Sequence, residues 1–228
     1  MQWIDGSTKL KPSSYFSWLL RSSLYAGNLA PEHLRDLDKS GLTPATIRQQ
    51  LIRSVPPWMT SKLLGFDLPG IVSALLFPFP DPQGGFMNHV RMKIFPPLTD
   101  RNRHAIKYLQ PKESGVRLFF PLMTLDQALN GPAPLWLVEG EKKSLSVAQL
   151  GLVTVGFCGI EGWHSKGTDQ LIEDFKYIQL KDRIIELLPD GDWRTNPAVR
   201  KGAERFAAVL SDRSARPRLV ILPEVIAA

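Results

Sequence analysis

Three carboxylates stand directly behind two apolar runs in this sequence. Glu139 follows Leu-Trp-Leu-Val, and Asp190 and Asp192, with one glycine between them, follow Leu-Leu-Pro. Carboxylates that meet at such density repel one another unless a cation lies among them. Mg²⁺ suits a site of this kind, because it binds a few carboxylates, keeps several waters and engages substrate phosphates. These residues therefore predict a site for Mg²⁺ that binds phosphate groups.

Each acidic motif also has a purely structural interpretation. Asp-Gly is a common turn sequence, so Asp190 and Gly191 could simply reverse the chain. Glu139 and Gly140 could mark a helix N-terminus, where the helix dipole stabilises a carboxylate. Taken singly, either motif favours the structural interpretation. Their shared position behind two strands of one pattern favours the metal site.

A strand–helix alternation in the last hundred residues would position these carboxylates. The expected strands cover residues 135–138, 153–158, 183–188 and 218–222, and the expected helices cover residues 141–150, 168–177 and 198–210. Strands separated by helices of this length predict βαβ units, a parallel sheet and right-handed crossovers. Ligands bind outside the carboxyl ends of such strands. If strands 135–138 and 183–188 are neighbours, the three carboxylates meet at one edge.

The first half of the chain predicts helices followed by a β-rich segment. Residues 10–54 are expected to be mainly helical, with Thr43 as the N-cap and Pro44 at the first position of a helix over residues 45–54. Further along, two strands at 71–79 and 86–95 are expected to form a hairpin around an Asp-Pro-Gln-Gly-Gly turn, with a loop or edge at 95–98 and a short strand at 118–122.

The expected fold class is α/β: a C-terminal parallel sheet flanked by helices, preceded by a smaller mixed α+β basic subdomain. We expect three consecutive domains: a helical N-terminal segment over residues 1–60, the basic subdomain over 61–130 and the sheet domain over 131–228.

Positive charge is concentrated between residues 84 and 117. This window holds seven Lys and Arg residues against two acidic ones: Arg91, Lys93, Arg101, Arg103, Lys107, Lys112 and Arg117 against Asp100 and Glu113. Clustered cations neutralise phosphates and release their condensed counterions. A solvated basic hairpin explains the pattern equally well, so charge alone does not choose between them.

The composition narrows the class of protein further. The chain has 228 residues, 43% of them hydrophobic, and a net charge of +6, which favours a polyanionic partner. A single cysteine, Cys158, excludes a disulfide framework and a cysteine-rich zinc module within this sequence. No stretch approaches the roughly 18 apolar residues of a membrane span, and the N-terminus lacks a signal-peptide pattern. We expect a protein of a reducing compartment, with no membrane partner.

The acidic motifs and the basic window together resemble the TOPRIM-domain cores of DnaG-type primases, above all those encoded by plasmids and phages. The motifs that carry this resemblance are Val138-Glu139-Gly140-Glu141, Leu188-Pro-Asp190-Gly-Asp192, Ile106-Lys107-Tyr108-Leu109, the hairpin from Leu76 to Lys93, and Ser40-Gly-Leu-Thr-Pro-Ala-Thr-Ile47. They follow one another in the family's order from about residue 34 to residue 222.

The resemblance implies roles for particular residues. Glu139, Asp190 and Asp192 would hold Mg²⁺ or Mn²⁺ and position a nucleoside triphosphate and a 3′-hydroxyl for nucleotidyl transfer. A nucleotide- or DNA-binding role is implied for five basic residues: Lys107, Arg91, Lys93, Arg117 and Lys142. The implied partners are a single-stranded DNA template, nucleoside triphosphates and a replicative helicase or other replication protein.

The sequence also departs from the family pattern. Lys142 and Lys143 stand where primases often carry an acidic residue, and Trp193 to Pro197 replace an Ala-Gly pair after the aspartates. No zinc module precedes the core and no helicase-binding domain follows Ala228, so we expect a minimal core or a piece of a larger protein. Two other functions stay open: a TOPRIM-type metal-dependent nuclease, and a non-catalytic nucleic-acid-binding accessory protein of replication.

Overall fold

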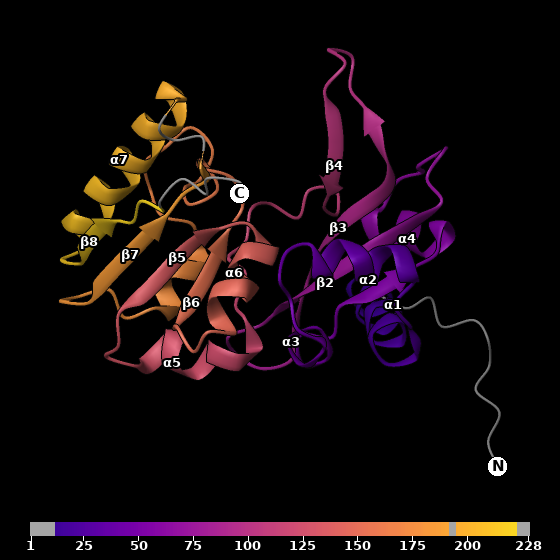
Figure 1. The fold of residues 1–228 in the computed structure, drawn as a ribbon, viewed down its shortest axis with the longest axis horizontal. Helices are drawn as coiled ribbons and strands as arrows, with labels where there is room; N and C mark the ends of the chain where they lie inside the picture. Colours follow the sequence, from indigo (N-terminus) through magenta and orange to yellow (C-terminus); the bar gives the residue numbers. More distant parts are fainter. Residues whose placement is uncertain (1–11, 192–194, 223–228) are drawn as a thin grey trace, which may run out of the picture. The chain divides into compact units, whose positions relative to one another are not determined.

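The computed structural model describes residues 12–191 and 195–222 (Figure 1). The chain forms two units, each assembled from separate stretches. The first unit comprises Met1–His33, Leu51–Pro78 and Asn88–Ser114, and the second comprises Leu34–Gln50, Phe79–Met87 and Gly115–Ala228. The units therefore interleave along the sequence. The division into three consecutive domains, 1–60, 61–130 and 131–228, stays a prediction.

A parallel sheet in the second unit carries the acidic motifs. Its strands, in chain order, are β5 (Leu135–Glu139), β6 (Thr154–Phe157), β7 (Ile184–Leu188) and β8 (Arg216–Leu219), and their spatial order is β6-β5-β7-β8. All three neighbouring pairs are parallel. Continuous apolar runs are typical of parallel strands covered on both faces, and Leu137 and Val138 are fully buried. The predicted α/β class, with a parallel sheet flanked by helices, is confirmed.

Two helices form the crossovers of this sheet. Helix α6 (Glu141–Ala148) connects β5 to β6, and α7 (Pro197–Asp212) connects β7 to β8. These connections run in opposite directions across the sheet, so right-handed crossovers place α6 and α7 on opposite faces. Helix α7 begins at Pro197 because the Asn196 side chain accepts a hydrogen bond from the Ala198 N–H at 3.1 Å.

Aromatic packing fixes α7 on the sheet. The ring of Phe206 lies parallel to the ring of Trp163, with centroids 4.8 Å apart, and meets Phe157 edge to face. Phe175 contacts Phe206 from a third direction. Trp163 and Phe206 are completely buried, and aromatic side chains bury more apolar area than other residues. This cluster is the core on the α7 side of the sheet.

The first unit contains a second, separate sheet, in the order β1-β2-β3-β4. Its strands are β1 (Arg53–Val55), β2 (Ser73–Pro80), β3 (Phe86–Thr99) and β4 (Ala105–Leu109), and the tip of the β2–β3 turn belongs to the second unit. The hairpin predicted at 71–79 and 86–95 is confirmed. Strand β4 pairs antiparallel with β3 and carries the Lys-Tyr-Leu motif, a strand that the sequence did not indicate.

Short helices accompany the two sheets. The first unit has α1 (Pro12–Ala26) and α4 (Pro57–Leu64), which pack on each other, and α2 (Pro31–Asp38) contributes to both units. The second unit has α3 (Pro44–Gln49), η1 (Leu122–Thr124), α5 (Leu125–Asn130) and η2 (Glu173–Tyr177). No helix among residues 12–191 and 195–222 is long and apolar enough to cross a membrane.

Four local predictions are wrong. The helix expected over 45–54 ends at Gln49, because Leu51 adopts a φ of 55° and the chain enters β1. Residues 95–98 lie within β3, where the two prolines lack N–H groups and the pairing register shifts between Lys93 and Leu98. Residues 118–122 form one bridge, Phe119 to Gly156, rather than a strand. Residues 168–177 do not form an α-helix: Leu171 makes an isolated bridge to His164, and Glu173–Tyr177 form the short 3-10 helix η2.

Candidate functional site

Glu139 and Asp190 lie at the point where the strand order of the parallel sheet reverses. Strand β5 leads outward to β6, and β7 leads the opposite way to β8, so the topological switch point falls between β5 and β7. Glu139 is the last residue of β5, and Asp190 follows β7 by two positions. The Asp190 backbone N–H donates a hydrogen bond of 2.9 Å to Glu139 Oε2. The structure thus brings together two of the predicted ligands at the edge where α/β sheets bind ligands.

The third predicted ligand, Asp192, lies outside the described residues. Within residues 12–191 and 195–222, no group of three or more His, Cys, Asp or Glu side chains could hold a metal ion. Two carboxylates still fit Mg²⁺, which proteins often bind through one or two carboxylates together with waters and substrate phosphates. The donor chemistry of Glu139 and Asp190 therefore fits a divalent cation.

Gly140 shapes the turn between the first carboxylate and helix α6. Its backbone has φ 90° and ψ 147°, a conformation that L side chains rarely adopt. The turn lets α6 begin at Glu141, one residue later, and brings the third residue of the helix back over the strand end. The position of a Cβ at Gly140 would be 3.5 Å from Lys143 Cε. The stem of Lys143 therefore passes over Gly140.

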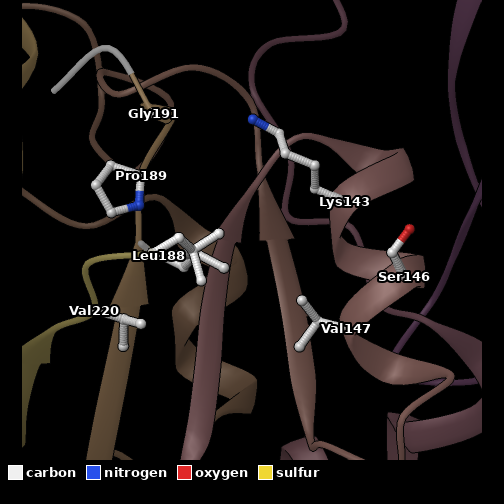
Figure 2. Close-up of a pocket in the computed structure, with 8 residues that line it drawn as sticks. Lys143, Ser146, Val147, Leu188, Pro189, Gly191 and Val220 are labelled. Atoms are coloured by element: carbon white, nitrogen blue, oxygen red, sulfur yellow. The ribbon is translucent and has the colours of Figure 1, made fainter. Parts of the chain in front are cut away.

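The ammonium of Lys143 forms an ion pair with Asp190 Oδ1. Both side chains are about half exposed, at 51% for Lys143 and 46% for Asp190. Beside them lies a cavity of about 250 Å³ whose walls include Val147, Leu188 and Val220 (Figure 2). Figure 2 shows Lys143 at the rim of this cavity, with its ammonium directed toward Gly191. The open space leaves room for the Lys143 side chain to change its direction.

The neighbouring Lys142, predicted to bind nucleotide or DNA, points elsewhere. Its ammonium lies 3.1 Å from Asp36 Oδ2, and each of these two side chains is only 18% exposed. Successive residues of a helix differ in direction by about 100°, so Lys142 and Lys143 face different neighbours. The contact ties α6 to α2. A nucleotide- or DNA-binding role for Lys142 stays a prediction.

Arg117 is likewise held by an acidic partner. Its Nε lies 2.9 Å from Asp174 Oδ2 and its Nη2 lies 2.7 Å from Asp174 Oδ1. Asp174 is 2% exposed and also accepts the Leu118 N–H at 2.8 Å. Although partial burial opposes the charge, the hydrogen bond to Asp174 raises the pKa of Arg117. This forked pair fixes residues 117–118 against η2, and the predicted role of Arg117 toward nucleotide or DNA stays a prediction.

In the first unit, two of the predicted basic residues share one face of β3 with aromatic rings. Arg91, Lys93 and Phe95 alternate with buried residues and are half exposed. Lys93 pairs in register with Tyr108 of β4. Arg91 Cζ lies 5.5 Å from the Tyr108 ring centroid, and Lys93 Nζ lies 5.4 Å from that of Phe95. Cations beside aromatic rings suit a strand of nucleic acid, which offers phosphates and flat bases.

Lys107 does not join this face. Strand residues alternate between the two sides of a sheet, so Lys107 points away from the side that carries Tyr108. Its side chain is exposed. The structure therefore separates Lys107 from Arg91 and Lys93, which the resemblance groups together.

A charged cluster in the segment after β6 was not predicted from the sequence. His164 Nε2 lies 2.6 Å from Glu161 Oε2, and Arg205 of α7 contacts the same carboxylate. Arg205 also lies over the Trp163 ring, 5.3 Å from its centroid. The His164 side chain is only 14% exposed. The spacing of Glu161 and His164 was visible in the sequence, but their partner on α7 was not.

The family model described as "Domain of unknown function (DUF3854)" matches residues 127–226, which include both acidic motifs. No curated protein matches the chain. The solved structures similar to it include the Aquifex aeolicus primase (zinc-binding and RNA polymerase domains), with 17% identity and a TM-score of 0.64, and the DnaG catalytic core, with 19% identity and a TM-score of 0.62.

The structural likeness covers nearly all of this chain. It extends over 97% of the chain and 58% of the Aquifex aeolicus primase chain, and over 94% of the chain and 73% of the DnaG core. The chain thus spans well under two thirds of the length of the first of these proteins. At these identities the likeness establishes a shared fold: the chain has the fold of a DnaG primase core.

Proposed function

We propose that this chain is the catalytic core of a DNA primase, which carries out metal-dependent nucleotidyl transfer to make short primers on single-stranded DNA. The observation that carries the proposal is the hydrogen-bonded pair of Glu139 and Asp190 at the switch point of the parallel sheet. A ligand site is expected at this edge, and the chain shares its fold with primase cores.

In this proposal each group has a defined task. Glu139 and Asp190, together with Asp192, would hold Mg²⁺ or Mn²⁺, and the bound cation would supply positive charge for the phosphate oxygens and for the attacking and leaving oxygens. The 3′-hydroxyl gives up its proton to solvent while its oxygen forms a bond to the α-phosphorus, and the bond from that phosphorus to the α,β-bridging oxygen breaks, so that pyrophosphate leaves. Arg91 and Lys93 bind the template backbone through the basic aromatic face of β3, and Lys107 binds phosphate from the other side of β4.

The partners follow from the same proposal. They are nucleoside triphosphates, a single-stranded DNA template and a replicative helicase or other replication protein. A TOPRIM assignment for residues 131–228, an origin on a plasmid or phage and a cytoplasmic location belong to the proposal as well.

The direct test is primer synthesis on a single-stranded template with labelled nucleotides and Mg²⁺ or Mn²⁺. The wild-type chain should make short labelled products. Glu139→Gln and Asp190→Asn should each reduce synthesis by about 10²-fold or more, because the loss of one electrostatic element at a transfer site costs that much. Both variants should bind the template as the wild type does. Unchanged synthesis in both would exclude this site.

The same preparation separates a primase from a nuclease that uses the same carboxylates. End-labelled single-stranded DNA is incubated with the cation and without nucleotides. The proposal requires the label to keep its length. Shortening that disappears in Glu139→Gln would replace the primase by a nuclease, and template binding without synthesis or cleavage would indicate an accessory protein.

A further inference from the structure

Lys143 occupies a position that the proposed function does not yet use. It is the third residue of α6, its stem passes over Gly140, and its ammonium pairs with Asp190 Oδ1. Asp190 is in turn linked to Glu139 through its backbone N–H. A lysine therefore supplies positive charge at the carboxylate pair that would bind the divalent cation.

The contact between Lys143 and Asp190 depends on whether a divalent cation is bound. Two nearby carboxylates repel each other, and an ammonium beside them lowers that repulsion. A divalent cation on Asp190 would reverse the balance, because it takes over the neutralisation and repels the ammonium. Lys143 is half exposed and borders a cavity of about 250 Å³, so its flexible side chain has room to leave Asp190.

A nucleotide would give the released ammonium a new partner. Phosphates that complete the coordination of the cation lie within the first few ångströms of it, and a lysine binds such oxygens as a mobile point charge. We propose that Lys143 is the resident counterion of this carboxylate pair: it competes with the divalent cation for Asp190 and turns to the phosphates of the nucleotide once the cation is bound. This inference rests on the proposed function.

The competition between Lys143 and the cation for Asp190 is tested by the binding of Mn²⁺ alone, followed through the electron paramagnetic resonance signal of the free ion. Lys143→Met keeps the length of the side chain and removes its charge. It should bind Mn²⁺ about 3- to 10-fold more tightly than the wild type, as expected when one unit charge leaves a half-exposed site beside a divalent ion. Lys143→Arg, which keeps the charge, should stay closer to the wild type.

The contact of Lys143 with the nucleotide phosphates is tested with an unreactive nucleotide, α,β-methylene ATP, at saturating Mn²⁺. Here Lys143→Met should bind about 3- to 10-fold more weakly than the wild type, because a charge-assisted contact to phosphate is lost. Lys176→Met, at a lysine that pairs with Glu173, controls for the loss of one positive charge elsewhere. It should change neither affinity measurably.

The proposal thus predicts that Lys143→Met strengthens Mn²⁺ binding and weakens nucleotide binding. A lysine that merely shapes Asp190 would weaken both affinities when it is replaced, and a solvated lysine would change neither, so either result overturns the inference. Glu139→Gln distinguishes this failure from a failure of the proposed function. If Glu139→Gln leaves Mn²⁺ binding unchanged, the carboxylate site itself is wrong; if it abolishes binding while Lys143→Met has no effect, only the role of Lys143 is wrong.

Discussion

Glu161, His164 and Arg205 form a titratable cluster that joins the loop after β6 to helix α7. Burial opposes the imidazolium of His164, but hydrogen bonds to the Ser165 carbonyl and to Glu161 outweigh it and raise the pKa of His164 above its ordinary 6.5. The hydrogen bond from His164, against a smaller opposing effect of burial and with help from Arg205, lowers the pKa of Glu161 below its ordinary 4.5. The cluster therefore makes folding depend on pH.

The sign of that dependence follows from linkage. A raised pKa stabilises the fold below the unfolded value and loses this effect as the pH rises through the folded value; a lowered pKa does the reverse. The excess stability of the wild type over His164→Gln should therefore be largest between about pH 4.5 and 6.5 and should shrink on both sides. Urea unfolding across this range measures it. An excess that grows steadily up to alkaline pH would contradict the ion pair.

At the scale of single residues, the sequence indicated the carboxylates but not their counterion. Glu139 and Asp190 could be predicted because each follows an apolar run, and strand ends collect at one edge of a parallel sheet. Lys142 and Lys143 are identical in type and adjacent. Only the path of the chain through Gly140 decides that Lys142 meets Asp36 and Lys143 meets Asp190.

At the scale of elements, the packing of α6 on β6 depends on a close approach at Gly156. A Cβ at this position would lie 2.4 Å from Ser144 Oγ and 3.1 Å from Phe119 Cβ. Gly156→Ala should lower the free energy of unfolding by about 1–3 kcal/mol, the usual cost of overpacking. The midpoint of urea unfolding measures the loss. The double change Gly156→Ala with Ser144→Ala should recover part of it, and no recovery would place the strain elsewhere.

Elements whose signals are local were predicted well. Strand β5 follows from an apolar run, and helix α7 matches the helix predicted over residues 198–210. The segment 168–177 was predicted wrongly, because a tertiary interaction decides its shape. Asp174 points inward, accepts the Leu118 N–H and pairs with Arg117, and the chain around it forms only the short 3-10 helix η2. A partner 56 residues away leaves no periodic pattern in the segment itself.

At the scale of the whole molecule, the proposed DNA-binding residues and the proposed metal-binding residues lie in different units. The basic aromatic face lies in the first unit and the carboxylate pair in the second. A double change, Arg91→Gln with Lys93→Gln, should weaken binding of single-stranded DNA and make the dependence of log affinity on log salt shallower by about 1.4, at roughly 0.7 for each phosphate contact. Fluorescence anisotropy at several salt concentrations measures the slope.

The matched control for this change is Glu139→Gln, which should keep the wild-type salt slope because it alters only the other unit. A slope that falls in Glu139→Gln and stays constant in the double variant would reverse the assignment of the two units. Mn²⁺ binding should show the opposite pattern, with a loss in Glu139→Gln and none in the double variant.

The central claim is that Glu139 and Asp190 hold a divalent cation, and metal-directed cleavage of the chain tests it most directly. Fe²⁺ replaces Mg²⁺, and ascorbate with peroxide generates radicals that cut the backbone near the bound ion. We predict cuts close to residues 139–140 and 189–191, which Mg²⁺ suppresses by competition and which Glu139→Gln abolishes. Cleavage elsewhere, or cuts near these residues that neither Mg²⁺ nor the substitution affects, would contradict the account.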